Sequence, residues 1–137
     1  QHDAQVRFHG YVAEDDIAAF FGDARASVFD YSATTGSSGV LHQTASYGAV
    51  PVFPEIGDFV DICRDEGIGG VHYTPNSPEE MASAIRDVLS DVDLANRIAA
   101  DNLEASLELP LADVVAFHMD RLFGTVAGRD IPRAQLA

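Results

Sequence analysis

The residues best suited to chemistry lie in one run, YSATTGSSGVLHQTASYG, from Tyr31 to Gly48. It contains a Gly/Ser-rich turn followed by an amphipathic segment. Gly36 and Gly39 allow tight backbone paths and let a ligand approach the main chain closely. If a helix starts at this turn, its first N–H groups lack intrahelical acceptors and favour an anion such as a diphosphate. The amides concerned are those of Ser37, Ser38, Gly39 and Val40. The same turn could also serve only as a helix cap.

Short apolar runs alternate with amphipathic segments along the whole chain, and these elements must position the turn. The predicted strands are 6–12, 26–30, 50–53 and 70–74, with an irregular stretch before the last. The predicted helices are 15–24, 37–47, 77–89, one starting at Asp91 or Asp93, and 111–123. This order predicts an α/β domain with a mostly parallel sheet and helices on both faces. Ligands of such sheets bind beyond the carboxyl ends of the strands. The loops expected there follow Val12, Asp30, Phe53 and Thr74.

Composition bounds the size and the partners of the protein. The 137 residues, 47% of them hydrophobic, suffice for one compact domain. A net charge of −14 disfavours nucleic acid and anionic membrane surfaces. All eight basic residues are arginines, which excludes chemistry that depends on a Walker or Schiff-base lysine. Five scattered histidines and a single cysteine have no metal-ligand spacing, so we expect no metal site.

The chain carries no visible targeting or membrane signal. Cys63 has no partner for an intramolecular disulfide, so nothing requires an oxidising compartment. No apolar run approaches the roughly 20 residues of a membrane span. We therefore expect a cytoplasmic protein without an integral membrane segment. The sequence enters a strand-like run soon after Gln1, which suggests an internal fragment. We expect residues 1–124 to form one domain that lacks its first strands, and residues 125–137 to form a tail.

Four consecutive motifs together resemble the C-terminal half of the retaining glycosyltransferases of the GT-B fold (glycosyl transferases group 1, family 4-like). VRFHGYV is similar to the family pattern V-x-F-x-G-x-V, and DDIAAFFGDARASVF to the helix and strand that follow it. TGSSGVLHQTASYGAVPVFPEIGDF aligns without a gap with E-G-F-G-L-x-x-x-E-A-M-A-x-G-x-P-V-V. GIGGVHYTPNSPEEMASAIRDVL is similar to the ending of the family pattern. The resemblance covers nearly the whole chain and implies a Rossmann-like three-layer domain, the C-terminal half of a GT-B fold.

The resemblance implies a role for particular residues. Gly10 takes the glycine position of the first motif and counts with Gly36, Ser37, Ser38, Gly39 and Val40 among the donor-binding candidates. Thr35 and Gln43 stand where the family has two glutamates, one beside the donor sugar and one at the nucleotide ribose. They are the candidate catalytic residues. Gln43 can still bind ribose hydroxyls, whereas Thr35 supplies no negative charge.

The resemblance also implies the reaction and the partners. The donor would be a UDP- or GDP-sugar, transferred with retention and without a metal ion or other cofactor. The acceptor site would lie on a missing N-terminal domain. The Arg and Lys that neutralise the diphosphate in the family would precede Val6. The full-length parent would then be an enzyme, and this chain alone would be inactive.

Two further readings remain open. The second is a non-catalytic nucleotide-binding or protein-interaction domain derived from the same fold, which the loss of the glutamate pair would suit. The third is another GT-B enzyme, such as a nucleotide-sugar epimerase. His9 and Tyr11 would lie near the base in the family, although a structural role suits His9 better. We expect packing roles for His42 and Cys63, and a helix-capping role for Asp58 or Asp61. His72 and Tyr73 are expected to be ordinary sheet residues.

Overall fold

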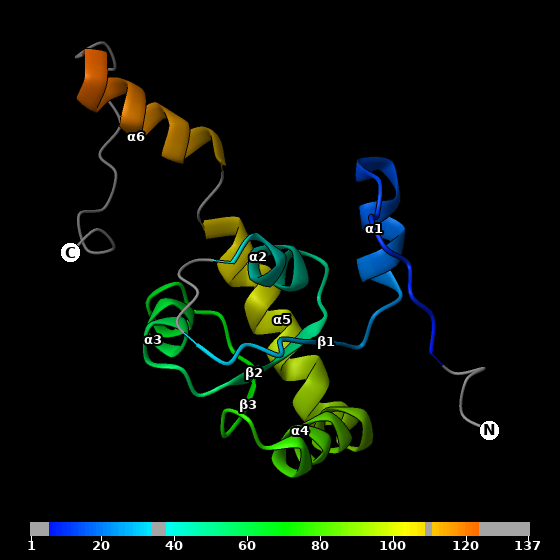
Figure 1. Cartoon of the computed structure of the whole chain (residues 1–137). Helices are drawn as coiled ribbons and strands as arrows, with labels where there is room; N and C mark the ends of the chain where they lie inside the picture. Colours follow the sequence, from blue (N-terminus) through cyan, green and yellow to red (C-terminus); the bar gives the residue numbers. More distant parts are fainter. Residues whose placement is uncertain (1–5, 34–37, 109–110, 124–137) are drawn as a thin grey trace.

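The computed structural model describes residues 6–33, 38–108 and 111–123 (Figure 1). Its elements, in chain order, are α1 (Glu14–Gly22), β1 (Ala26–Val28), α2 (Gly39–Ser46), β2 (Val50–Pro54), α3 (Gly57–Asp65), β3 (Val71–Tyr73), α4 (Pro78–Ser90), α5 (Val92–Glu108) and α6 (Leu111–Phe123). The predicted tail at 125–137 lies outside these residues.

The three strands form one parallel sheet in the order β1-β2-β3. Val28 lies opposite Val52 on one side of β2, and Val71 lies opposite Val52 on the other. All five residues of β2, VPVFP, are buried. A continuously apolar strand of this kind suits the centre of a parallel sheet that is covered on both faces.

Side chains alternate between the two faces of β2, and each face has its own core. Phe53 faces α2 and α3, whereas Val50 and Val52 face α4 and α5. The first core contains Phe29, Leu41, Ala45, Phe53, Phe59, Cys63 and Ile68. The second contains Val50, Val52, Tyr73, Ala84, Val88 and Ala95. Helices thus cover both faces of a parallel sheet, which confirms the predicted Rossmann-like α/β fold.

Side chains cap the starts of α4 and α5, the two helices that follow the last strand. Ser77 caps α4 by accepting a hydrogen bond from the Glu80 amide at 3.3 Å, and Pro78 is the first helical residue. At the start of α5, the Asp91 carboxylate accepts from the Leu94 amide at 2.9 Å. The predicted starts of these helices, at residue 77 and at Asp91 or Asp93, agree with the structure to within one residue.

The predicted strand at 6–12 is wrong. Residues 6–10 and 12–13 have no regular structure, and a bend occupies Tyr11. Phe8 is 97% exposed and Tyr11 is 91% exposed. Strand propensity reflects packing against a neighbouring strand, and the described part of the chain provides no such neighbour for this run. The β-branched and aromatic composition therefore indicated a strand that does not form here.

Helix α3 was missed, because the stretch between the second and third strands was expected to be irregular. Its start carries no side-chain cap: Ile56 occupies the N-cap position and Gly57 begins the helix. The helix is held by its apolar side, through buried Phe59 and Cys63. Asp58 and Asp61, expected to cap a helix, lie within α3, and neither is its N-cap residue. Tertiary packing stabilises the helix in place of a side-chain cap at the N-cap position.

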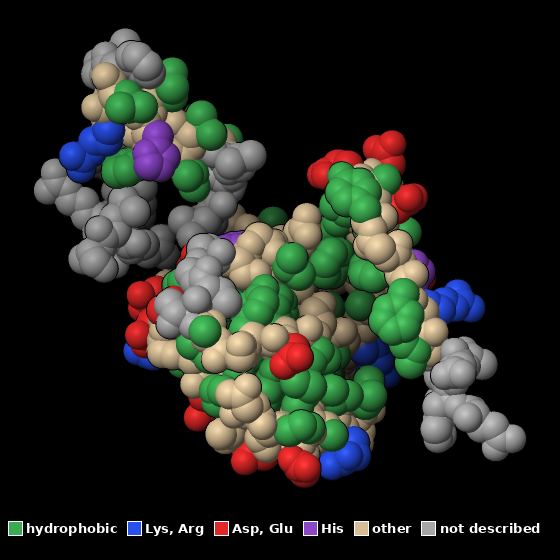
Figure 2. Space-filling view, in the orientation of Figure 1, with side chains coloured by type: hydrophobic (Ala, Val, Ile, Leu, Met, Phe, Trp, Pro, Cys, Tyr) green, Lys and Arg blue, Asp and Glu red, His purple; other side chains and the backbone are tan. Residues whose placement is uncertain are grey.

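Helices α1 and α6 stand apart from the sheet and its covering helices (Figure 1). Phe21 is the buried residue of α1, and its ring stacks on Tyr47 with 5.9 Å between centroids. Figure 2 shows hydrophobic side chains on the surface of both helices, with acidic side chains at the outer end of α1. None of the described helices is both long and apolar enough to cross a membrane.

Candidate functional site

The chain leads from β1 to α2 through the Gly/Ser-rich turn identified in the sequence. Thr35, Gly36 and Ser37 lie outside the described residues. Ser38 is the N-cap residue of α2, with an extended backbone (φ −115°, ψ 114°). Its carbonyl accepts the Leu41 amide at 3.0 Å and so starts the helix. Its hydroxyl lies 3.3 Å from the Tyr31 hydroxyl.

The first turn of α2 presents main-chain donors. Gly39 and Val40 are exposed, and their amides have no acceptor among the described residues. The helix dipole places partial positive charge at the same point. The start of α2 therefore offers at least two N–H groups to an anion, at the carboxyl-end side of β1 where parallel sheets bind ligands.

Gln43 lies on α2 one helical turn beyond Gly39, so the two residues share a face of the helix. The Gln43 side chain is half-buried and has no hydrogen-bond partner among the described residues. The fold thus brings Gln43 together with Ser38, Gly39 and Val40 on one short helix. Gly10 lies on the irregular run before α1 and has a positive φ of 64°, which glycine adopts without strain.

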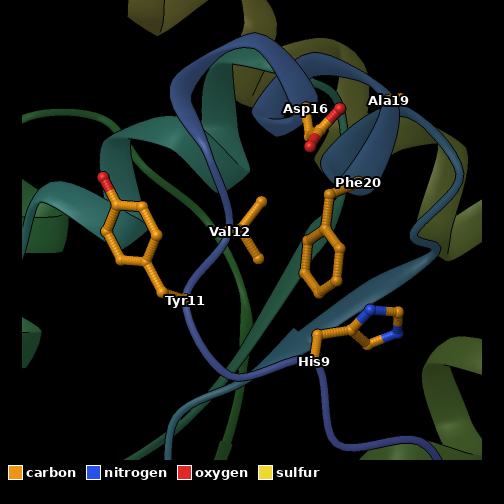
Figure 3. Close-up of a pocket in the computed structure, with 6 residues that line it drawn as sticks. All are labelled: His9, Tyr11, Val12, Asp16, Ala19 and Phe20. Carbon is orange, nitrogen blue, oxygen red and sulfur yellow. The ribbon is translucent and has the colours of Figure 1, made fainter.

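An open hollow of about 470 Å³ separates the run around His9 from helix α1. The His9 ring meets the Phe20 ring edge-on, with 5.3 Å between centroids. Figure 3 shows that Val12 points towards Phe20, whereas the Tyr11 ring points away from it. The contact with Phe20 agrees with the structural role expected for His9.

Two other polar side chains near the carboxyl ends of the strands, those of Tyr73 and Glu80, have partners within the chain. The Tyr73 hydroxyl donates to the Phe29 carbonyl at 2.6 Å and ties β3 to the end of β1. Burial, together with the negative charge of Asp30, raises the pKa of Tyr73. Glu80 accepts the Thr74 amide at 2.9 Å, and hydrogen bonds from the Thr74 side chain and then from this amide lower the pKa of Glu80. These groups hold the loops in place.

Cys63 is a buried hydrophobe, as expected. Its side chain is 3% exposed, and burial, with the nearby charge of Glu66, raises the pKa of the thiol to about 11. At pH 8 only roughly one native thiol in a thousand would be ionised, against about one in four for an ordinary cysteine.

We therefore expect the folded protein to react with Ellman's reagent at least about a hundred-fold more slowly than the protein in 6 M guanidinium chloride. Absorbance at 412 nm measures both rates. Equal rates, after correction for the denaturant with a free thiol such as N-acetylcysteine, would contradict the buried placement.

Within the described ranges, no group of three or more His, Cys, Asp or Glu side chains could hold a metal ion. The model of a known protein family, described as glycosyl transferases group 1, matches residues 1–91 of the 137. A search among curated proteins finds no match. The family match covers the sheet and helices α1 to α4, and it includes the candidate site residues Ser38, Gly39, Val40 and Gln43. This chain belongs to the glycosyl transferases group 1 family.

Proposed function

We propose that the chain is the donor-binding domain of a glycosyltransferase that transfers a sugar from a nucleotide diphosphate sugar to an acceptor with retention. The observation that carries the proposal is the first turn of α2, where the amides of Gly39 and Val40 have no described acceptor. Family membership supplies the reaction class, and the Gly/Ser turn supplies the anion site.

The hydrogen-bond donors at the start of α2 must outweigh the repulsion between the acidic chain and a diphosphate. The chain carries a net charge of −14, which repels a diphosphate at long range. In physiological salt such charges are screened over roughly 8–10 Å. Amide donors at hydrogen-bond distance and the helix dipole act within that range. A diphosphate can therefore bind at α2 in spite of the acidic surface.

Thr35 takes the proposed role at the donor sugar, and Gln43 takes the proposed role at the ribose. The Gln43 amide both donates and accepts, which suits the vicinal hydroxyls of ribose. Thr35 would contact a sugar hydroxyl. As the diphosphate leaves, the α2 amides stabilise the charge that develops on it, the contribution that usually dominates such chemistry. The acceptor would bind to a further domain, and this chain alone would not catalyse transfer.

One observation favours a second function, a nucleotide-binding domain without catalysis. Neither Thr35 nor Gln43 carries the charge of the glutamates in the family pattern. Both functions predict nucleotide binding at α2, so a binding experiment tests their common premise. Turnover by a full-length parent would then separate them.

Titration of the ¹⁵N-labelled chain with UDP and with GDP is the direct test. We expect saturable shifts of the Ser38, Gly39 and Val40 amide signals, with weak affinity in the range of about 0.1–1 mM. Uridine and guanosine, which lack phosphates, are the control ligands and should leave these signals in place. The proposal includes no metal ion, so EDTA and Mg²⁺ should give the same shifts. Shifts confined to other elements would contradict the proposal.

A further inference from the structure

His42 joins the start of α2 to the end of α3. Its Nδ1 atom lies 2.9 Å from the Ser38 carbonyl oxygen. Its Nε2 atom lies 2.7 Å from Oε2 of Glu66, the residue that follows α3. Residue spacing does not indicate this arrangement, because Glu66 lies 24 positions away and belongs to the stretch expected to be irregular.

His42 lies between two oxygen atoms on different elements. Its Nδ1 atom can hold the Ser38 carbonyl whenever this nitrogen carries a proton, in the neutral Nδ1–H tautomer as well as in the imidazolium form. Its Nε2 atom lies at ion-pair distance from Glu66, whose Oε2 atom is buried and makes no hydrogen bond with the described residues.

Apart from Glu66, the described residues that line the hollow beside His42 carry no charged side chain. His42 and Glu66 line a hollow of about 150 Å³. Helix α2 contributes Ala45 and Ser46 to the same hollow, the segment after α3 contributes Ile68, and α5 contributes Ala105 and Ser106. Glu66 is thus the charged group that faces His42 among the described residues of the lining. The exposed fraction of the side chain is 44% for His42 and 27% for Glu66, so the pair is screened only in part.

The contact with Ser38 has a direct consequence for the proposed anion site. The Ser38 carbonyl and the Gly39 N–H belong to one planar peptide unit, and in a trans peptide they point in opposite directions. The Ser38 carbonyl accepts the Leu41 amide at 3.0 Å and the His42 amide at 3.4 Å, and the His42 Nδ1 atom adds a side-chain contact that restrains the same peptide unit. A hydrogen bond to the carbonyl also polarises the same peptide, which makes its N–H a stronger donor.

We propose that His42 is a positioning residue for the diphosphate: bridged between the Ser38 carbonyl and Glu66, it fixes the peptide that presents the Gly39 N–H. This inference rests on the proposed function. His42 itself does not touch the donor, and it acts through the peptide unit of Ser38 and Gly39.

The test measures the affinity of the full chain for UDP in a set of His42 variants. Asparagine places its amide near the position of Nδ1 and can still hold the Ser38 carbonyl. Glutamine places its amide near Nε2 and can reach only Glu66. We expect His42→Ala and His42→Gln to weaken UDP binding roughly three- to ten-fold, and His42→Asn to restore most of the loss.

His72→Asn is the matched control. His72 lies on β3, and its Nδ1 atom is 3.9 Å from Glu55, so it is also a histidine beside a carboxylate but is not part of α2. UDP affinity should be unchanged in this variant. Thermal unfolding of every variant distinguishes a lost contact from a lost fold.

The contrast between asparagine and glutamine gives a readout that a merely structural role would not change. General destabilisation would weaken UDP binding in both variants, whereas the positioning role requires that asparagine restore the affinity and that glutamine not restore it.

The outcomes separate the two proposals. If the wild type does not bind UDP or GDP, the proposed function fails. If the wild type binds and His42→Ala binds equally well, the positioning role is overturned. The role is also overturned if His42→Asn binds UDP as weakly as His42→Ala.

Discussion

Alanine in place of Gly70 is expected to lower the free energy of unfolding by about 3 kcal/mol, a large part of the stability of a small domain. A Cβ atom at this position would lie 2.6 Å from the Pro51 carbonyl oxygen and 2.5 Å from Cε1 of Phe53. The first contact is with the backbone of the central strand, and the second is with a ring that is fully buried in the core. Neither can move without disturbing the pairing of β2 with β3.

Gly22→Ala provides the control for this prediction. Gly22 ends α1, and a Cβ there meets nothing within 4 Å. Since alanine is the better helix former, the variant should be unchanged or more stable by up to about 1 kcal/mol. Urea unfolding followed by circular dichroism gives both values. Coincident midpoints for Gly70→Ala and the wild type would show that β3 does not pack against β2 as described.

The sheet could be predicted because its signals are local. Continuous apolar runs, separated by helix-sized segments, identify buried parallel strands, and β2 is buried over its whole length. The start of α4 could be predicted for the same reason, since Ser77 and Pro78 satisfy the requirements of a helix N-terminus by residue type alone.

The errors arose where tertiary contacts decide the structure. Residues 6–12 have strand composition but no described neighbour to pair with. Helix α3 has Ile56 at its N-cap, without a side-chain cap, but it has a well-buried apolar side. The same distinction applies to the site. The sequence predicted Ser38, Gly39 and Val40 at the start of a helix, and the structure has a helix that begins at Gly39. The contact between His42 and Glu66 depends on how α3 packs, so residue spacing could not predict it.

Proline in place of Gly39 is expected to weaken UDP binding at least about ten-fold while leaving the fold intact. Gly39 is the first residue of α2, where a helix tolerates proline because the N–H has no intrahelical acceptor. The extended backbone of Ser38 is compatible with a following proline, and a Cβ at Gly39 meets nothing within 4 Å. The Ser77-Pro78 start of α4 is the same arrangement elsewhere in this chain.

The substitution therefore removes one main-chain donor and little else. A hydrogen bond to a charged phosphate contributes about 1.5–3 kcal/mol, which corresponds to roughly ten- to a hundred-fold in affinity. Gly39→Ala keeps the N–H and should bind UDP within about two-fold of the wild type, so the pair of variants isolates the donor from the side chain. Calorimetric titration with UDP and thermal unfolding are measured on both. If Gly39→Pro melts like the wild type and binds UDP equally well, the diphosphate does not use this amide, and the donor must bind elsewhere on the sheet.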